Sequence, residues 1–316
     1  MPTAVVTQWS DGHGDGTGPG DWPTSSASLP SLVAGMLGDL DPRPGDRVLE
    51  IGTGTGWNAA LLARRLGPDH VTTIELDRTV ADKAAARLTA AGSPPRVVVG
   101  DGAHGCPDTA PHDGVLATCS VTSIPPAWLE QTRPGGRIVA PYSPLLAGGR
   151  IVRLTVSSPT RAEGRFVRPS AFMRLRGHRY SGTPADRYMN GDWPAGADRS
   201  WTRLDPADAL RYDWAAALAV GLTLPDLYQR RTAYGDGWTW WLFDTAVTSW
   251  ATVDAIPDTE RYDVRQHGPR RLWDEIENAW DQWQKAGWPG VERYGLTVDG
   301  TTHTAWLDTP DNPLHH

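Results

Sequence analysis

The feature that most constrains the fold is an alternation of short apolar strands with helices between residues 47 and 141. The pattern predicts strands at 47–51, 71–76, 96–100, 112–118 and 138–141, with helices at 58–66 and 80–91. Such alternation favours parallel pairing through right-handed crossovers. We therefore expect an α/β fold with a doubly wound, mostly parallel sheet, to which residues 150–157 and 165–175 add antiparallel edge strands.

A glycine-rich turn, Gly52 to Gly56, connects the first predicted strand to the first helix. Glycines let a ligand approach the backbone, and such turns bind nucleotides at the carboxyl ends of parallel strands. The dinucleotide pattern G-x-G-x-x-G would need its last glycine at Trp57, so that pattern is absent. Glu50, just upstream, is unfavourable beside pyrophosphate but suits a cation. These features favour S-adenosyl-L-methionine (SAM), which carries a sulfonium, an ammonium and no phosphate, over NAD.

Acidic residues follow the next two predicted strands. Glu75 ends the second strand, where its carboxylate can accept hydrogen bonds from both ribose hydroxyls. Asp101 and Gly102 follow the third strand, where they can meet the adenine. No metal site is expected. The predicted cofactor-binding residues are Glu50, Gly52, Thr53, Gly54, Thr55, Gly56, Asn58, Glu75, Leu76, Asp101 and Gly102.

From Thr24 to about Leu175 the chain resembles the protein-L-isoaspartate O-methyltransferase family of class I SAM-dependent methyltransferases. The resemblance is carried by VLEIGTGTGWNAALLA at residues 48–63, by Gly100-Asp101-Gly102 and by Pro134-Gly135-Gly136-Arg137. It implies a Rossmann-like methyltransferase fold, S-adenosyl-L-homocysteine as product, and methylation of an aspartyl or isoaspartyl carboxylate. The methyl ester can then cyclise to a succinimide, which hydrolyses to aspartate or isoaspartate.

The segment Thr24 to Pro30 resembles the hydroxyl-rich S-x-P segment of that family, which covers the methyl donor and contacts the substrate carboxylate. Ser28 matches the serine of S-x-P and is the candidate for orienting the carboxylate, with Ser26 and Thr24 as further candidates. Alternatively, Ser28 only caps the helix that follows, a position that serine favours. The family usually carries histidine after S-x-P, whereas this chain has Ser31-Leu32-Val33, so the substrate side of the pocket departs from the family pattern.

The expected chemistry needs no general base, because a carboxylate with a pKa of about 4 is already ionised at neutral pH. Holding oxygen, methyl and sulfur in line is then the main task of the protein. Thr122 and Ser123 follow the fourth strand and are candidates for binding the peptide substrate, or else belong to a plain loop.

The composition changes after about Gly177, and we predict four parts. These are a flexible segment at 1–23, the methyltransferase domain at 24–177, a linker at 178–200 and a smaller, tryptophan-rich α+β domain at 201–316. In the last part we expect a helix from Pro206, strands within 238–253, an amphipathic helix at 270–286 and a hairpin at 294–307. The resemblance extends here to actinobacterial relatives that carry a C-terminal extension and methylate ribosomally synthesised precursor peptides, so we expect this domain to recognise a peptide.

Side chains in the tryptophan-rich domain allow both structural and binding roles. Trp280 and Trp283 share one face of the amphipathic helix and should form a small core. A second group lies in one predicted strand and consists of Trp238, Trp240 and Trp241. Because side chains alternate between the two faces of a strand, one of them should be exposed and available for binding. Four arginines either form a basic patch for an acidic peptide or are solvated separately: Arg261, Arg265, Arg270 and Arg271.

Composition excludes several classes of protein. The net charge of −7 disfavours a nucleic-acid binder. The sequence has no apolar run long enough for a membrane span and no signal-peptide pattern at its start. Cys106 and Cys119 are too few for a disulfide scaffold and should be buried thiols. We therefore expect a cytoplasmic enzyme whose partner is a peptide or protein substrate. The oligomeric state stays open, with a monomer as the working expectation.

Three other functions remain open. General repair of isoaspartate in proteins is one. A small-molecule O-methyltransferase is another, and it would need a base such as His104 or His112. The third is a SAM-binding partner of another enzyme without activity of its own, although the intact glycine turn and Glu75 argue against loss of function.

Overall fold

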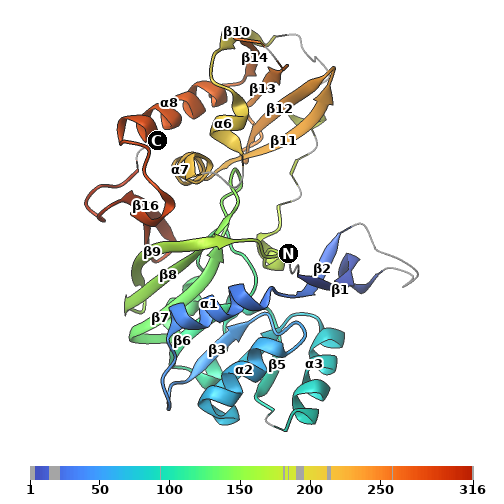
Figure 1. The fold of residues 1–316 in the computed structure, drawn as a ribbon, viewed down its shortest axis with the longest axis vertical. Helices are drawn as coiled ribbons and strands as arrows, with labels where there is room; N and C mark the ends of the chain where they lie inside the picture. Colours follow the sequence, from blue (N-terminus) through green and yellow to red (C-terminus); the bar gives the residue numbers. More distant parts are fainter. Residues whose placement is uncertain are drawn as a thin grey trace. The chain divides into compact units, whose positions relative to one another are not determined.

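The computed structural model describes residues 4–13, 22–92, 94–180, 182–183, 185–189, 196–211, 215–257 and 259–314. The chain divides into two compact units (Figure 1). The first unit comprises Met1–Tyr142, Gly149–Arg179 and Gly295–Trp306, and the second comprises Ser143–Gly148, Tyr180–Tyr294 and Leu307–His316.

The described residues of the first unit form a nine-stranded sheet in the order β16-β15-β9-β8-β7-β6-β3-β4-β5. The five strands from β7 to β5 pair in parallel, and β7, β8, β9 and β15 pair antiparallel. The predicted doubly wound sheet with an antiparallel edge is therefore confirmed. The strands are β3 (Val48–Ile51), β4 (Val71–Glu75), β5 (Arg96–Val99), β6 (His112–Ala117), β7 (Thr132–Tyr142), β8 (Gly149–Ser158), β9 (Arg161–Ser170), β15 (Tyr294–Asp299) and β16 (Thr302–Leu307).

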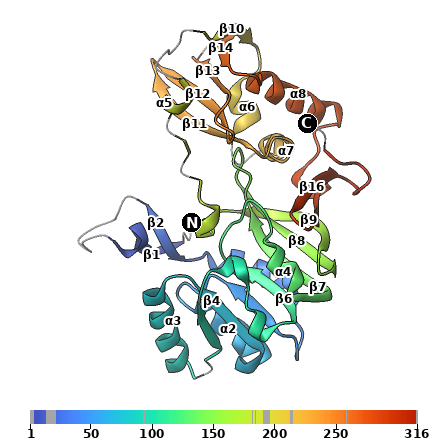
Figure 2. The same cartoon turned by 180° about the vertical axis from the view of Figure 1, so that it is seen from behind.

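Helices cover both faces of this sheet. Helices α1 (Pro30–Leu40) and α2 (Trp57–Leu66) pack their apolar residues against β3, β4, β6 and β7, and they lie in front of the sheet in Figure 1. Helix α3 (Arg78–Ala90) contacts β4 and β5. Helix α4 (Pro126–Glu130) contacts β7 and β8 and is seen in the view from behind in Figure 2. This arrangement leaves the carboxyl ends of β3, β4 and β6 for the glycine-rich turn and its neighbours.

The N-terminal segment contains a strand that the sequence did not predict. β1 (Val5–Trp9) pairs antiparallel with β2 (Pro23–Ala27), and a short helical turn, η1 (Ser10–Gly12), follows β1. The expectation of a flexible segment at 1–23 is therefore wrong for β1, because pairing with β2 satisfies its backbone hydrogen bonds. Residues 1–3 and 14–21 lie outside the described residues.

The predicted hairpin at 294–307 forms as β15 and β16, but it belongs to the sheet of the first unit. β15 pairs with β9, with Gly295 opposite Arg165 and Val298 opposite Ala162. The prediction that 201–316 forms one separate domain is therefore wrong at its end. The physical reason is that β9 would otherwise leave an open edge, while Leu296 and Val298 gain burial in the sheet.

The described residues of the second unit form a five-stranded antiparallel sheet in the order β10-β14-β13-β12-β11, with α6, α7 and α8 on one face and the short helix α5 on the other. This is the α+β architecture that the sequence predicts. β10 begins inside the predicted linker, because pairing with β14 extends the sheet to Asp198. The elements are α5 (Asp186–Met189), β10 (Asp198–Thr202), α6 (Pro206–Leu210), α7 (Ala215–Thr223), β11 (Leu227–Tyr234), β12 (Gly237–Asp244), β13 (Trp250–Ala255), β14 (Tyr262–His267) and α8 (Leu272–Lys285).

Tryptophans form much of the core between the helices and this sheet. Trp240, Trp273 and Trp280 are buried there, and Trp283 packs against them. The predicted core role of the α8 tryptophans therefore holds, and Trp238 is the exposed member of its strand, at 48%. Helix α7 escaped prediction because it is apolar on every side, so it shows no amphipathic period.

Candidate cofactor and substrate site

The glycine-rich turn lies at the carboxyl end of β3 and adopts a backbone that favours glycine. Gly52, Gly54 and Gly56 have φ angles of +92°, +54° and +84°. A Cβ added to Gly52 would lie 2.9 Å from the Thr118 Oγ1 atom. The turn therefore requires glycine at Gly52 both for its left-handed conformation and for its close contact with the segment after β6.

A buried polar cluster of Glu50, Thr53, Asn58 and Thr73 supports the turn from beneath. Asn58 Nδ2 donates to Glu50 Oε1 at 2.7 Å, and Thr73 Oγ1 donates to Glu50 Oε2 at 2.6 Å. The Thr53 and Thr73 hydroxyls are 2.7 Å apart. All four side chains are buried. The expectation that the Glu50 side chain meets the cofactor directly is therefore corrected: Glu50, Thr53 and Asn58 use their side chains to hold the turn.

Burial disfavours the charged form of Glu50. Burial raises its pKa from 4.5 to about 7, against the two hydrogen bonds, which lower it, and the nearby charge of Glu75 adds to the rise. Its donors are neutral groups, so the burial of its charge is not offset by a salt bridge.

Two carboxylates lie beside the turn. Glu75 accepts hydrogen bonds from the Gly54 N–H at 2.9 Å and from the Asp77 N–H at 3.1 Å. Asp101 accepts one from the Ala103 N–H at 2.9 Å. The charges of Glu75 and Asp101 add to burial in raising the pKa of Cys119 to about 12. Cys106 is buried as the sequence predicts, whereas Cys119 is half-buried, and the raised pKa keeps the Cys119 thiol protonated at neutral pH.

These groups fit SAM better than a pyrophosphate. Glu75 and Asp101 create a negative potential beside an open backbone turn, which favours a sulfonium and an ammonium. Leu76 and Trp57 are partly exposed next to Glu75 and Gly56, and they offer apolar surface to an adenosine. Gly102 has a packing role, because a Cβ there would lie 2.4 Å from Ile51 Cγ2. Thr55 is half-buried within the turn.

The hydroxyl-rich segment lies against the turn. A Cβ added to Gly54 would be 3.6 Å from the carbonyl oxygen of Ser26 in β2. Thr24 is occupied within the N-terminal hairpin, where it donates to Gln8 at 3.0 Å and accepts from the Asp11 N–H at 3.1 Å. In this structure the Thr24 hydroxyl therefore has a structural role, and its contact with substrate stays a prediction.

Ser28 follows β2 and is half-buried. Helix α1 starts at Pro30, and its N-cap residue, Leu29, makes no side-chain capping bond. The alternative in which Ser28 caps this helix is therefore not observed.

The segment after β6 brings two unpredicted histidines to this edge of the sheet. The Thr122 N–H donates to His178 Nδ1 at 3.2 Å, and the Ile124 N–H donates to His303 Nε2 at 2.8 Å. Ser123 lies between them and is half-buried. No sequence signal identified these histidines, because they lie 56 and 179 residues from their partners.

The histidines considered as bases for another chemistry are placed differently. His112 begins β6, at the amino end of the strand and away from the glycine turn, and burial lowers its pKa. His104 is exposed in the short helical turn after Asp101. His112 is therefore wrong as a base at this site.

Most arginines of the predicted basic patch form ion pairs with carboxylates of the second unit. Arg265 pairs with Asp254, and Arg271 pairs with Asp198. Arg261 instead lies over the Trp201 ring, 4.2 Å from its centroid. A joint patch of these arginines for an acidic peptide is thus not formed, because most of the charges are compensated within the unit.

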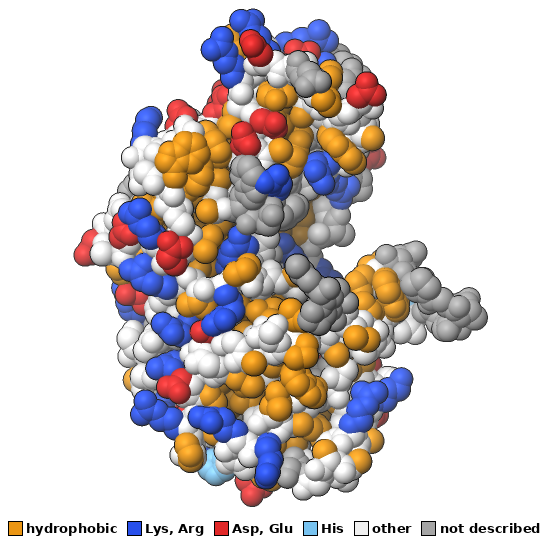
Figure 3. Space-filling model, in the orientation of Figure 1, with side chains coloured by type: hydrophobic (Ala, Val, Ile, Leu, Met, Phe, Trp, Pro, Cys, Tyr) orange, Lys and Arg blue, Asp and Glu red, His pale blue; other side chains and the backbone are white. Residues whose placement is uncertain are grey.

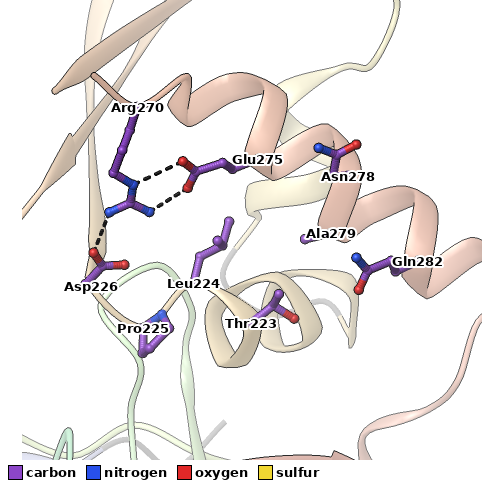
Figure 4. A pocket seen from close by; sticks show the side chains of 9 residues that line it. All are labelled: Thr223, Leu224, Pro225, Asp226, Arg270, Glu275, Asn278, Ala279 and Gln282. Atoms are coloured by element: carbon purple, nitrogen blue, oxygen red, sulfur yellow. Dashed lines mark hydrogen bonds and ion pairs between the residues drawn. The ribbon is translucent and has the colours of Figure 1, made fainter. Parts of the chain in front are cut away.

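A cavity of about 550 Å³ lies between the end of α7 and α8 (Figure 4). At one end Arg270 bonds to Glu275 and Asp226, so its guanidinium is engaged. The remaining lining combines apolar side chains with amides: Thr223, Leu224, Pro225, Asn278, Ala279 and Gln282.

Charge is dispersed on the face shown in Figure 3, where acidic, basic and apolar side chains are interspersed. Among the described residues no helix is long and apolar enough to cross a bilayer. The same residues contain no group of three or more His, Cys, Asp or Glu side chains arranged to hold a metal ion.

Comparison with known proteins agrees with this geometry. The family model described as protein-L-isoaspartate(D-aspartate) O-methyltransferase matches residues 21–162. A protein-L-isoaspartate O-methyltransferase of Methylorubrum populi is 41% identical over 148 residues, which cover 47% of this chain and 68% of that protein. One of Methanopyrus kandleri is 44% identical over 117 residues, which cover 36% of this chain and 52% of that protein.

A solved protein-L-isoaspartate O-methyltransferase structure aligns with a TM-score of 0.53 at 22% identity, covering 97% of this chain and 86% of that one. At this identity the likeness concerns the fold alone. Fold and site together define a class I methyltransferase whose cofactor is SAM. The chain belongs to the protein-L-isoaspartate O-methyltransferase family.

Proposed function

We propose that this chain transfers the methyl group of SAM to the side-chain carboxylate of an isoaspartyl or aspartyl residue in a peptide or protein. The observation that carries the proposal is the glycine turn with the carboxylates of Glu75 and Asp101 beside it and the hydroxyl-rich strand β2 lying against it. The names of the curated relatives support the same reaction.

SAM supplies an electrophilic methyl group on a cationic sulfur. The acceptor carboxylate is ionised at neutral pH, so the chain need not remove a proton. Glu75 and Asp101 would hold the adenosine end, and the turn would hold the amino-acid end. The Ser28 hydroxyl would donate a hydrogen bond to one carboxylate oxygen and leave the other oxygen directed at the methyl group. Orientation of this kind is the main source of rate in such a displacement.

The finer proposal concerns the substrate. An enzyme that modifies a ribosomally synthesised precursor peptide would methylate a chosen aspartate, and succinimide formation would follow. An enzyme that repairs proteins would accept isoaspartate in many sequences. The fold of the solved relative matches both units of this chain. The presence of the second unit is therefore no separate argument for a dedicated precursor peptide, and this favours repair.

The test uses two synthetic peptides that differ only in containing L-aspartate or L-isoaspartate. Methyl transfer is followed by mass spectrometry, together with S-adenosyl-L-homocysteine release. Methylation of the isoaspartyl peptide alone supports repair, and methylation of an aspartate in one sequence context supports a dedicated peptide substrate. Transfer to neither, with SAM bound, would contradict the proposal.

Ser28→Ala tests the orienting hydroxyl. We expect kcat/KM for the peptide to fall about tenfold, the worth of one lost hydrogen bond to a charged group, while SAM affinity stays unchanged. Ser157→Ala is the matched control, because Ser157 is exposed in β8, outside the candidate site. Equal activities of the two variants would remove Ser28 from the site.

A further inference from the structure

The loop Val121–Ile124, here called the substrate loop, is joined to the core of the first unit by hydrogen bonds at its start and just before it. Thr118 Oγ1 donates to the carbonyl of Gly52 at 2.6 Å, which connects this segment to the glycine turn. The Val121 N–H donates to the Pro141 carbonyl at 2.8 Å. These bonds place the start of the loop at the carboxyl ends of β3, β6 and β7, the edge where ligands of such sheets bind.

Two imidazoles hold the rest of the substrate loop. Backbone N–H groups only donate, so His178 Nδ1 must accept from Thr122, and His303 Nε2 must accept from Ile124. The other ring nitrogen of His303 lies 3.1 Å from the Thr301 carbonyl, to which it donates. Both contacts therefore require an unprotonated acceptor nitrogen, and the second bond of His303 fixes its tautomer.

The two histidines come from distant parts of the chain. His303 is in β16, the last strand of the sheet. His178 is in η5 (Arg176–His178). Next to it in the chain, Arg176 and Arg179 form ion pairs with Asp11 at 2.8 and 2.9 Å. η5 thus joins the N-terminal hairpin, which lies against the glycine turn, to the substrate loop.

We propose that His178 and His303 are positioning residues, whose unprotonated ring nitrogens fix the substrate loop in the conformation that receives the peptide. The inference rests on the proposed function for the identity of that peptide. The order of the loop itself can be measured without any substrate.

Acid should release the loop, because a protonated imidazole presents a donor to an N–H group. Burial lowers the pKa of both histidines below the ordinary 6.5. Asp101 acts to raise the pKa of His178, while Arg174 and His303 lower it further. Tyr142 stacks on His303 and stays neutral, since burial raises its pKa to about 12. The loop is therefore held at neutral pH and loses these bonds only in mild acid.

The test compares variants that keep or remove the acceptor. His303→Gln and His178→Asn keep an amide oxygen near the original acceptor position and cannot be protonated in this range. His303→Leu and His178→Leu remove the acceptor. His70→Gln is the matched control, because His70 directly precedes β4 and so lies at the amino end of that strand, whereas the substrate loop lies at the carboxyl ends. SAM affinity and circular dichroism establish that each variant folds.

We expect each leucine variant to raise KM for the isoaspartyl peptide about tenfold, with kcat and SAM affinity within about twofold, since one backbone bond of about 1.4 kcal/mol is lost. The amide variants should keep KM near the wild-type value at neutral pH. They should also lack part of the rise in KM that we expect for the wild type as the pH falls below the ordinary imidazole range. Unchanged KM in both leucine variants, or the full acid rise in both amide variants, would overturn the proposal.

Hydrogen exchange of residues 121–124 separates this inference from the proposed function. Without substrate, the Thr122 and Ile124 amides should be protected in the wild type and in the His70→Gln control, and should exchange faster in the leucine variants. If the wild type transfers no methyl group but the exchange result holds, the proposed function fails and the positioning role stands. Equal exchange in all variants refutes the positioning role, whatever the activity.

Discussion

Two buried acidic side chains, Asp254 of the second unit and Glu50 of the first, are held in different ways. In the second unit, Asp254 accepts from Thr239 at 2.6 Å and pairs with the Arg265 guanidinium at 2.6 Å. In the first unit, Glu50 has only neutral donors, and a second carboxylate, Glu75, lies near enough to raise its pKa. Asp254 is compensated by a cation from the same sheet. Glu50 is not, and it lies under the turn where a cationic cofactor is expected. The contrast concerns these two residues, because buried Asp39 of the first unit pairs with Arg168, and buried Asp244 of the second unit accepts hydrogen bonds from Thr248 and Ser249.

A buried charge without a cationic partner reduces stability. Glu50 has this property directly beneath the candidate cofactor site, where a perturbed pKa is one indication of function. The acids around the glycine turn supply the negative potential that SAM needs, whereas Asp254 is balanced by Arg265. Each of the following changes tests one side of that contrast.

The largest expected effect is the loss of the second-unit core in Trp273→Ala. Trp273 is fully buried between α8 and the sheet, so its removal should cost about 3–5 kcal/mol. We expect the unfolding transition of the second unit to move strongly in a denaturant titration, while calorimetry shows SAM affinity within about twofold of wild type. A parallel loss of SAM binding would show that the core of the second unit also supports the cofactor site.

Glu50→Gln should change the pH dependence of stability in the first unit. The folded-state pKa of about 7 exceeds the ordinary 4.5, so the native state keeps a proton that the unfolded state releases. Stability should therefore fall as pH rises through this window, by about 3 kcal/mol in total. The variant does not titrate there and should lack this fall, as hydrogen exchange of β3 and β4 amides at about pH 5 and pH 8 will show.

Asp254→Asn is the matched buried-acid change in the second unit. It removes the anionic partner of Arg265, so we expect destabilisation at both pH values. If Glu50→Gln destabilised the chain equally at both pH values as well, the contrast between the two buried acids would fail.

The smallest expected effect comes from Gly52→Ala, compared with Gly45→Ala. Both glycines have nearly the same φ, +92° and +94°, but only Gly52 has a neighbour, Thr118, within reach of an added Cβ. Both variants should lose about 1 kcal/mol of stability from the left-handed backbone, and Gly52→Ala should lose more because its Cβ lies 2.9 Å from the Thr118 hydroxyl. Only Gly52→Ala should weaken SAM binding, by about tenfold in calorimetry. Equal SAM affinities would mean that the turn tolerates a side chain beside the cofactor.

Local pattern was enough to predict the parallel half of the first sheet. Its strands are short and apolar, its helices are amphipathic, and the glycine turn falls between β3 and α2, so each signal lies within a few residues. The amphipathic helix α8 and the hairpin of β15 and β16 were predictable for the same reason.

The assignment of the hairpin to a sheet was not predictable from local pattern. A strand with buried Leu296 and Val298 can pair with any open edge, and the sequence does not identify β9 as the partner. One consequence is practical: a chain cut near Gly177 would lose His178, β15 and β16, so such a truncation cannot test the second unit by itself.

The sequence by itself determined the class of fold, the glycine turn and the acidic residues beside it, because these depend on residue type and short spacing. Only the tertiary structure showed that Glu50 faces inward, that Thr24 is occupied by Gln8 and Asp11, and that His178 and His303 hold the substrate loop. The physical reason is that hydrogen-bond partners at long sequence separation are selected by packing, which leaves no local pattern in the chain.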